Sequence, residues 1–271
     1  MRQVKPKKAL GQHFLTDLSV AARIAATLDD YKGMPVLEVG PGMGVLTRFL
    51  LDNGHDVNVA EIDTESVAYL NENFPDLEGR IIEGDFLQMR LDEFYEGKDF
   101  CVIGNYPYNI SSQIFFKVLD YKDKIPCCTG MIQREVAQRL AAKPGSKTYG
   151  ILSVLIQVWY DIEYLFTVDE NAFTPPPKVK SAVVRLTRNK RSSMNCNEKL
   201  FKTVVKTSFN RRRKMLRNSV KPLLPEGTDI LDQDIFTKRP EQLSIAQFEE
   251  LTNILEPLIL KENDTKKQIR R

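Results

Sequence analysis

The sequence predicts an α/β fold, a Rossmann-like doubly wound sheet followed by a small helical domain. Short β-branched runs alternate with amphipathic stretches through the first half of the chain, which is the pattern of repeated strand–helix units. A glycine-rich turn at residues 40–44 follows the first of these runs directly. The charge also shifts along the chain, since residues 189–271 hold 18 Lys and Arg against 11 Asp and Glu, whereas residues 1–188 hold 21 against 25.

The expected elements follow one another in a regular order. A strand at 35–39 ends at the glycine turn, and a helix with an apolar face follows until 53–54. Further strands are expected at 56–60, 80–83, 100–103, 130–133, 160–168 and 181–187, and further helices around 67–74 and at 134–142. In a doubly wound sheet the ligand site lies at the carboxyl ends of the strands. The residues that follow each strand are therefore the candidates for a functional site.

A change of composition at 188–197 marks the predicted boundary between a domain of residues 1–188 and a domain of residues 189–271. In the second domain the sequence predicts a long amphipathic helix at 199–220, a helix that begins at a capping box at 244–247, and a disordered basic tail from residue 261. Residues 190–221 hold 11 basic side chains and one acid, Glu198. Such a concentration is typical of a surface that faces a polyanion, although a solvated helix face is the alternative.

The composition excludes several classes of protein. No stretch is long and apolar enough to span a membrane, and the basic first ten residues precede neither the apolar segment nor the cleavage site of a secretory signal. We therefore expect a cytoplasmic location. Two histidines and four cysteines without a C-x-x-C pair argue against a zinc site, so we expect no metal and reduced, mostly buried thiols.

The glycine turn and the next strand ends predict a nucleoside cofactor. Gly40 and Gly42 let the backbone approach a ligand closely, and Glu61 could accept both hydroxyls of a ribose. NAD and S-adenosylmethionine both carry that ribose. The third glycine comes one residue too early for the dinucleotide pattern G-x-G-x-x-G, and Glu38 suits a cofactor with a cationic reactive end, so the sequence favours S-adenosylmethionine. Asp85 could accept the amino group of the cofactor adenine or, as the alternative, cap a helix.

A tetrapeptide at the end of the fourth predicted strand, Asn105, Tyr106, Pro107 and Tyr108, could bind a planar amine. The amino nitrogen of adenine is a poor nucleophile, so an enzyme that alkylates it needs acceptors for its N–H groups and a surface on which the base stacks. The Asn105 side-chain oxygen and the carbonyl of Tyr106 or Pro107 could be the acceptors, and Tyr108 the stacking surface. A proline turn beside a packed tyrosine is the alternative.

Taken together, these residues resemble the ribosomal RNA adenine dimethyltransferases of the KsgA/RsmA type. The resemblance spans nearly the whole chain, in the blocks GQHFL at 11–15, VLEVGPGMGVLT at 36–47, GD at 84–85, NYPYNIS at 105–111, FTPPPKVKSAV at 173–183, RRKMLRN at 212–218 and RPEQLS at 239–244. The last two blocks favour this family over its relatives that methylate large-subunit RNA.

The resemblance implies that the enzyme transfers four methyl groups from S-adenosylmethionine to N6 of two neighbouring adenines in a hairpin near the 3′ end of small-subunit ribosomal RNA. It assigns cofactor contacts to the following residues, with Gly42 added because of its place in the turn: His13, Leu15, Gly40, Glu61, Asp85 and Asn105. The target base would be held by residues 105–108, and Phe173 could close its opposite face. The family usually has Asn where this chain has His13, and Leu or Ile where it has Tyr106, whose side chain should point away from the base.

RNA phosphates would be held by lysines near the N-terminus and by a basic cluster at 211–217: Lys5, Lys7, Lys8, Arg211, Arg213, Lys214 and Arg217. Arg212 returns to the apolar stripe of the predicted helix, so we expect it to bridge the two domains instead. We expect a monomer that binds the assembling small ribosomal subunit.

Three other functions remain open at this point. A related adenine-N6 methyltransferase could act on a different RNA. A non-catalytic ribosome assembly factor could use the same scaffold, although such a protein would not need the set of Gly40, Glu61, Asp85 and Asn105. A nicotinamide oxidoreductase is disfavoured by the glycine spacing and by the lack of a proton donor beside the tetrapeptide.

Overall fold

The computed structural model describes residues 4–269 apart from 5, 8–9 and 226, and no side chains beyond residue 260. The chain divides into two compact units, one of Met1–Gln138 and Trp159–Asn189 and one of Arg139–Val158 and Lys190–Arg271. The second unit thus includes residues 139–158, which the sequence-based division had placed in the first domain. Hydrogen bonds hold this segment there, since Gly145 N donates to Glu241 O at 2.7 Å and Arg212 Nη2 donates to Ser146 O at 3.2 Å.

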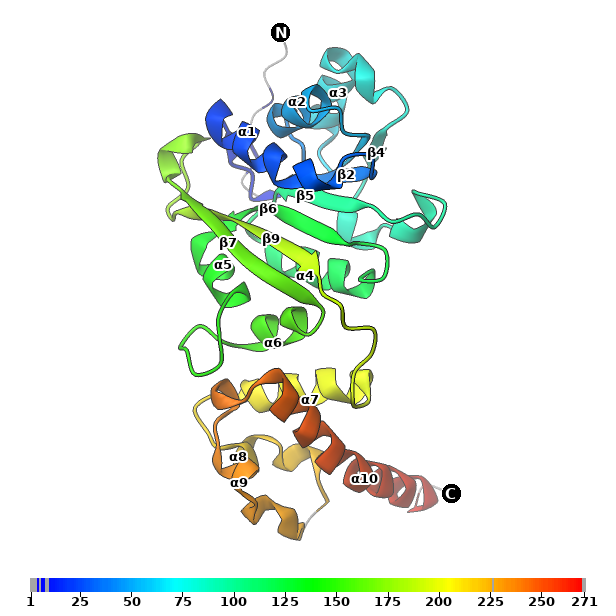
Figure 1. Ribbon diagram of the computed structural model, residues 1–271, viewed down its shortest axis with the longest axis vertical. Coiled ribbons are helices and arrows are strands. Elements are labelled where there is room, and N and C mark those ends of the chain that lie inside the picture. Colours follow the sequence, from blue (N-terminus) through cyan, green and yellow to red (C-terminus); the bar gives the residue numbers. More distant parts are fainter. Residues whose placement is uncertain (1–3, 5, 8–9, 226, 270–271) are drawn as a thin grey trace. The chain divides into compact units, whose positions relative to one another are not determined.

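A seven-stranded sheet with the order β4-β3-β2-β5-β6-β9-β7 lies at the centre of the first unit (Figure 1). Its strands are β2 (Val36–Val39), β3 (Val57–Glu61), β4 (Ile81–Glu83), β5 (Cys101–Asn105), β6 (Cys127–Gln133), β7 (Tyr160–Val168) and β9 (Ser181–Arg188). All seven predicted strands are present, although β6 begins three residues early and β5 continues to Asn105. The strands from β4 to β6 are parallel, whereas β9 runs antiparallel to β6 and β7. The connection from β7 to β9 contains no α-helix that could cross over the sheet, so these two strands pair as antiparallel neighbours.

Helices cover both faces of this sheet. Figure 1 shows α1 (Leu18–Ala25), α2 (Val45–Asp52) and α3 (Thr64–Asn73) on one face, and α4 (Ser111–Asp120) and α5 (Arg134–Leu140) on the other. Helix α1 was not predicted from the sequence. It begins at Asp17, whose carboxylate accepts hydrogen bonds from the backbone N–H groups of Ser19 and Val20. Short 3-10 helices complete the chain: η2 (Ala26–Tyr31), η3 (Pro75–Leu77), η4 (Phe86–Gln88), η5 (Leu91–Glu93), η6 (Glu170–Ala172), η7 (Lys221–Leu223), η8 (Asp229–Asp232) and η9 (Pro240–Gln242).

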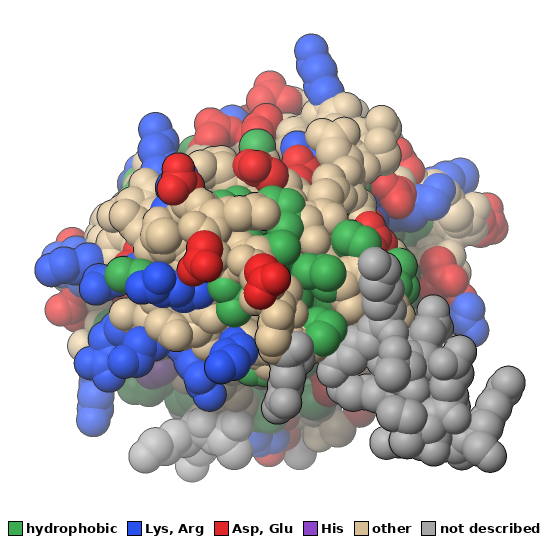
Figure 2. Space-filling view, turned by 90° about the horizontal axis from the view of Figure 1, so that it is seen from below, with side chains coloured by type: hydrophobic (Ala, Val, Ile, Leu, Met, Phe, Trp, Pro, Cys, Tyr) green, Lys and Arg blue, Asp and Glu red, His purple; other side chains and the backbone are tan. Residues whose placement is uncertain are grey.

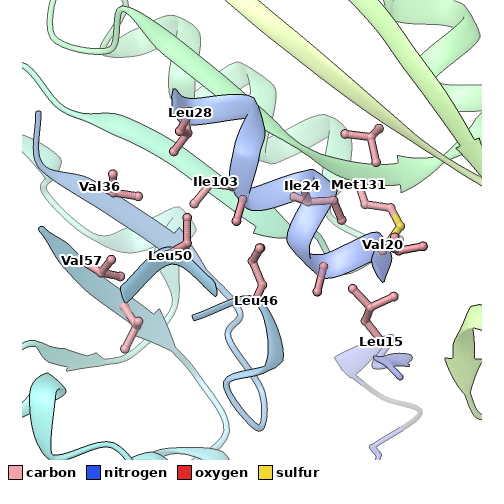
Figure 3. Close-up of a cluster of buried hydrophobic side chains, with 14 of the residues drawn as sticks. Leu15, Val20, Ile24, Leu28, Val36, Leu46, Leu50, Val57, Ile103 and Met131 are labelled. Atoms are coloured by element: carbon pink, nitrogen blue, oxygen red, sulfur yellow. The ribbon is translucent and has the colours of Figure 1, made fainter. Parts of the chain in front are cut away.

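A core of buried hydrophobic side chains fills the space between α1, α2 and the sheet (Figure 3). Val20 and Ile24 of α1 meet Leu46 of α2 and the strand residues Ile103 and Met131 there. Burial of one such aliphatic side chain contributes about 1.5–3 kcal/mol. This layer therefore fixes α1, and with it the residues just before α1, over the carboxyl ends of the strands.

A second, two-stranded sheet joins the N-terminal segment to the proline-rich connection. In it β1 (Phe14–Leu15) pairs antiparallel with β8 (Phe173–Thr174), so that Leu15 lies opposite Phe173. The backbone N–H of Thr16 adds a 2.8 Å hydrogen bond to the carbonyl of Ala172. Residues 11–15 are thereby held at the same edge of the main sheet as the glycine turn.

The second unit is helical, with α6 (Ile151–Gln157), α7 (Glu198–Asn210), α8 (Leu216–Ser219), α9 (Asp234–Thr237) and α10 (Ile245–Ile269). The single helix predicted at 199–220 is wrong, because α7 ends at Asn210 and a turn separates it from α8. Beyond this turn Leu216 is fully buried, and its N–H donates to Lys238 O at 2.8 Å, so the chain turns inward to place this side chain in the core. The capping box of Ser244 and Gln247 is present, with reciprocal bonds of 3.2 and 3.0 Å. Helix α10 continues to Ile269, where the sequence had predicted a disordered tail.

Candidate active site

A cavity of about 190 Å³ lies at the carboxyl ends of β2, β3, β4 and β5. We call it the strand-end cavity. Its wall is made by residues 10–15, 38–43, 45–46, 60–62, 84–87, 105–107 and 109–110. The cavity thus brings the predicted glycine turn and the first residues of the tetrapeptide close to Glu38, Glu61 and Asp85. The N-terminal segment also contributes to its wall.

The glycine turn takes a shape that most residues avoid. Gly40 and Gly42 both have positive φ angles, of 70° and 57°. A Cβ atom on Gly42 would also lie 3.1 Å from the ring of Phe14. The turn therefore presents bare backbone to the cavity, and the N–H of Gly42 donates to Glu61 Oε2 at 3.1 Å.

Glu61, the last residue of β3, is buried in the cavity wall. Its Oε1 accepts a 2.9 Å hydrogen bond from the backbone N–H of Asp63. Burial raises the pKa of Glu61, and the hydrogen bonds from Asp63 and Gly42 oppose that rise. A carboxylate can accept about four hydrogen bonds. Glu61 therefore keeps acceptor capacity that a ribose hydroxyl could use.

Glu38 lies at the end of β2 with only 1% of its surface exposed. Thr47 donates a 2.6 Å hydrogen bond to its Oε2. Burial raises the pKa of Glu38 to about 8, with a smaller contribution from the negative charge of Glu61. The carboxyl is thus shielded from solvent, and a cation placed in the cavity would favour its ionised form.

Asp85 has the capping role that the sequence offered as an alternative, and its binding of a cofactor amino group stays a prediction. It caps η4, because the N–H of Leu87 donates to its Oδ1 at 2.9 Å, and it also lines the strand-end cavity. The carboxylate has further acceptor positions, which could bind an amino group.

The tetrapeptide begins on the last residue of β5. The Asn105 Nδ2 donates to the carbonyl of His13 at 3.1 Å, so that its Oδ1 is left as an acceptor. The side chain of Tyr106 is fully buried, and its hydroxyl donates to Thr129 O at 2.7 Å. Tyr108 hydrogen bonds through its hydroxyl to Ser181 Oγ, and burial raises the pKa of this phenol.

The N-terminal segment contributes residues to the wall of the strand-end cavity, whereas Phe173 of the proline-rich segment does not. His13 lines the cavity, but its ring nitrogen Nδ1 lies 2.9 Å from Pro175 O. Leu15 also lines the cavity, although its side chain packs in the core. Phe173 does not line the cavity. With 3% of its surface exposed it packs in the same core as Leu15, and its contact with the target base stays a prediction.

The three lysines near the N-terminus that were predicted to bind RNA phosphates differ in what the structure shows of them. Lys8 and Lys5 lie outside the described residues. Lys7 forms ion pairs with Asp63 and Glu65, so its charge is already compensated. The sequence analysis did not single out Asp63 as the partner of Lys7. Asp63 is also the N-cap of α3, and an acid at the start of a predicted helix is a signal by which it could have been found.

A basic hollow lies in the turn between α7 and α8, lined by residues 209–214 and Asn218. Arg211, Arg213 and Lys214 are exposed there, and Arg217 is exposed on α8. Arg212 is half-buried and hydrogen bonds to Ser146, so its expected bridge exists but lies within the second unit. Figure 2 shows Lys and Arg side chains gathered toward one side of the face that it presents.

Metal ligands and membrane-spanning helices are not found among the described residues. Within the part of the chain that the structure describes, no group of three or more His, Cys, Asp or Glu side chains is placed to hold a metal ion. No described helix combines the length and apolar character needed to cross a bilayer. The four cysteines are free thiols, and all except Cys196 are buried, as expected.

Known proteins are similar to this chain over most of its length. Residues 3–256 match the ribosomal RNA adenine dimethylase family. The Ribosomal RNA small subunit methyltransferase A of Parabacteroides distasonis is 71% identical over 254 residues, which are 94% of this chain and 95% of that protein. The protein of the same name from Phocaeicola vulgatus is 62% identical over 97% of this chain and 94% of its own length.

Two solved structures are similar as well. A dimethyladenosine transferase from Plasmodium falciparum has a TM-score of 0.73 and 26% identity, over 90% of this chain and 97% of that one. The 23S rRNA methyltransferase ErmE has a TM-score of 0.64 and 28% identity, over 89% of this chain and 99% of that one. The chain belongs to the ribosomal RNA adenine dimethylase family.

Proposed function

We propose that the protein transfers methyl groups from S-adenosylmethionine to N6 of two adjacent adenines in a hairpin near the 3′ end of small-subunit ribosomal RNA, during assembly of the subunit. The observation that carries this proposal is the Asn105 amide, which His13 O holds so that Oδ1 is left as an acceptor beside the glycine turn. The names of the relatives support the small subunit as the substrate.

The residues of the strand-end cavity fit S-adenosylmethionine. Glu61 would accept the ribose hydroxyls and Asp85 the adenine amino group, while the backbone of Gly40 and Gly42 approaches closely. Glu38 would face the cationic end. When bound, the cofactor supplies a sulfonium methyl group, which is an electrophile with a good leaving group already in place.

Because the electrophile is activated, the residues of the tetrapeptide need only position the amine. Asn105 Oδ1 and the carbonyl of Tyr106 or Pro107 would accept the N6 hydrogens and direct the nitrogen lone pair toward the methyl group. Tyr108 would stack on the target base. Removal of that base from its hairpin costs a few kcal/mol, and one aromatic stacking contact returns about 1–3 kcal/mol of it.

The RNA backbone would be held by the exposed cations Arg211, Arg213, Lys214 and Arg217. We assign no phosphate to Lys7, whose ammonium is paired with two carboxylates. The monomeric, metal-free state and the cytoplasmic location stay predictions.

Mass spectrometry of ribosomal RNA from a strain that lacks this protein tests the proposal. The two dimethyladenosines of the small-subunit RNA should disappear and return when the gene is restored. Unchanged small-subunit RNA would contradict the proposal.

An adenine-N6 methyltransferase for large-subunit RNA is the second candidate, because the fold is similar to that of a 23S rRNA methyltransferase. Methylation of naked large-subunit RNA but not of intact small subunits by the purified protein would favour it.

A non-catalytic assembly factor is the remaining alternative. Such a protein would rescue subunit assembly without consuming S-adenosylmethionine. Purified protein that binds small subunits but transfers no labelled methyl group would support it. The intact set of cavity acids argues for the enzyme.

A further inference from the structure

The side chain of His13 lies against the ring proposed to carry the target base. The imidazole and the Tyr108 ring are stacked, with their centroids 5.3 Å apart and an angle of 28° between their planes. The Nδ1 atom of the same imidazole lies 2.9 Å from Pro175 O. A carbonyl oxygen can only accept, so Nδ1 carries the hydrogen of this bond. The ring is thus fixed at one edge and stacked on one face.

The main chain of His13 acts on the other half of the tetrapeptide. Its carbonyl accepts the Nδ2 hydrogen bond of Asn105, which decides that the nitrogen points to the N-terminal segment and leaves Oδ1 as the free acceptor. Two residues earlier, a Cβ atom on Gly11 would lie 2.7 Å from Oδ1 of Asn109. Residues 11–13 are therefore packed closely along the loop that starts at Asn105.

The N-terminal segment is itself anchored at both ends, so it can impose a conformation. At one end Lys7 pairs with the buried carboxylate of Asp63, and Gln12 Nε2 lies 3.4 Å from the same carboxylate. At the other end β1 pairs with β8. A segment held in this way can act as a fixed support for the loop.

We propose that His13 is the positioning residue of the target base: its ring stacks on one face of Tyr108 and holds that ring in place, and its carbonyl orients the amide of Asn105. This inference rests on the proposed function. It differs from a side-chain contact with the cofactor, since the imidazole is directed to Tyr108 and Pro175. An asparagine, the residue that the family usually has here, could donate to Pro175 but offers no ring face to Tyr108.

Three substitutions separate the two contacts of the imidazole. His13→Phe keeps a ring face and loses the donor, whereas His13→Asn and His13→Gln keep a donor and lose the ring. The single-turnover rate on small ribosomal subunits, with labelled S-adenosylmethionine in excess, should fall about tenfold in the Asn and Gln variants, because a misplaced base loses its alignment with the methyl group. His13→Phe should stay within about threefold of wild type. The dissociation constants for S-adenosylmethionine and for the subunit should change less than about twofold in all three.

A double-mutant cycle with Tyr108→Ala shows whether His13 acts through Tyr108. In the Tyr108→Ala background, His13→Asn should slow the reaction no further. Additive losses, a weakened cofactor affinity, or a faster reaction of His13→Asn would each overturn the inference. The last result would mean that the imidazole occupies the place of the base.

The same cycle measured on the free energy of unfolding tests the contact without any reaction. Non-additive effects of His13→Asn and Tyr108→Ala on stability would support the stacking even if the wild-type protein methylated no RNA, an outcome that would remove the proposed function alone. Additive effects on stability, together with an active wild type, would remove only the inference.

Discussion

The hydroxyl of Thr47 donates a 2.6 Å hydrogen bond to Oε2 of Glu38, a carboxyl group buried in the wall of the strand-end cavity. This bond favours ionisation of Glu38, but burial outweighs it, so that the pKa rises to about 8. The acid that the sequence had associated with a cationic cofactor is therefore a carboxyl whose charge depends on what lies beside it.

Glu38 should make stability depend on pH. Its folded-state pKa of about 8 lies above the ordinary value of 4.5, so the folded protein binds the proton more tightly than the unfolded chain does. The stabilising contribution is complete below about pH 4.5 and is lost as the pH rises through about 8. Each unit of raised pKa corresponds to about 1.4 kcal/mol. Denaturation curves should show the free energy of unfolding of the wild type falling over this range relative to Glu38→Gln.

Thr47→Val is the matched control for that experiment. It removes the bond that lowers the pKa, so the loss of stability should extend to higher pH than in the wild type. Parallel curves for wild type and Glu38→Gln would show that the carboxyl does not titrate in this range.

Cofactor affinity should depend on Glu61 and Asp85. Glu61→Ala and Asp85→Ala should each weaken S-adenosylmethionine binding by about 1–3 kcal/mol, which is the loss expected for a charge-assisted hydrogen bond in a partly buried site. RNA affinity should change little. Titration calorimetry measures the first quantity, and wild-type affinity in both variants would remove these residues from the cofactor site.

Asp85→Asn is a sharper variant of the same test. The amide keeps an oxygen that can cap η4 through the N–H of Leu87, but it replaces the second acceptor with a donor. Affinity should therefore fall while the melting temperature stays near that of the wild type. A lower melting temperature with unchanged affinity would mean that Asp85 only caps the helix.

The ring of Tyr108 should matter more than its hydroxyl. Tyr108→Ala should lower turnover with little effect on RNA binding, because the ring is one stacking surface among many groups that hold the RNA. Tyr108→Phe should keep most of the activity, although loss of the bond to Ser181 Oγ should cost about 1 kcal/mol of stability. Ser181→Ala is the control that removes the same bond from the other side. If Phe at position 108 inactivates as fully as Ala, the phenol has a chemical role and the proposed mechanism is wrong.

The sequence predicted the parts of the molecule that local patterns determine. The seven strands and the residues at their ends follow from β-branched runs and glycine spacing, and the capping box at Ser244 follows from local chemistry. The break after Asn210 could not be predicted in this way, because the basic residues 211–214 permit a helix, whereas the burial of Leu216 beyond the turn depends on tertiary packing. The pairing of Phe173 with Leu15 could not be predicted for a similar reason, since it joins residues that are far apart in the chain.

Among the basic residues around the turn after α7, the exposed ones should contribute to RNA affinity and the half-buried Arg212 to stability. Neutralising Arg213, Lys214 and Arg217 together should lower the affinity for small-subunit RNA and flatten its salt dependence, by about 0.7–0.9 in log–log slope for each phosphate that the protein no longer neutralises. Cofactor affinity and melting temperature should stay near those of the wild type, because exposed charges contribute little to folding. Filter binding over a series of salt concentrations measures the slope.

Arg212→Ala is the matched control, because this half-buried guanidinium donates to Ser146 O at 3.2 Å, whereas Arg213, Lys214 and Arg217 are exposed. Its loss leaves the carbonyl of Ser146 without that partner, so stability should fall by about 1–2 kcal/mol while the salt slope stays nearly unchanged. An unaltered slope in the triple variant would mean that the charge excess is a solvated surface. The RNA would then have to be held by the first unit of the chain, and the affinity of the triple variant should equal that of the wild type at every salt concentration.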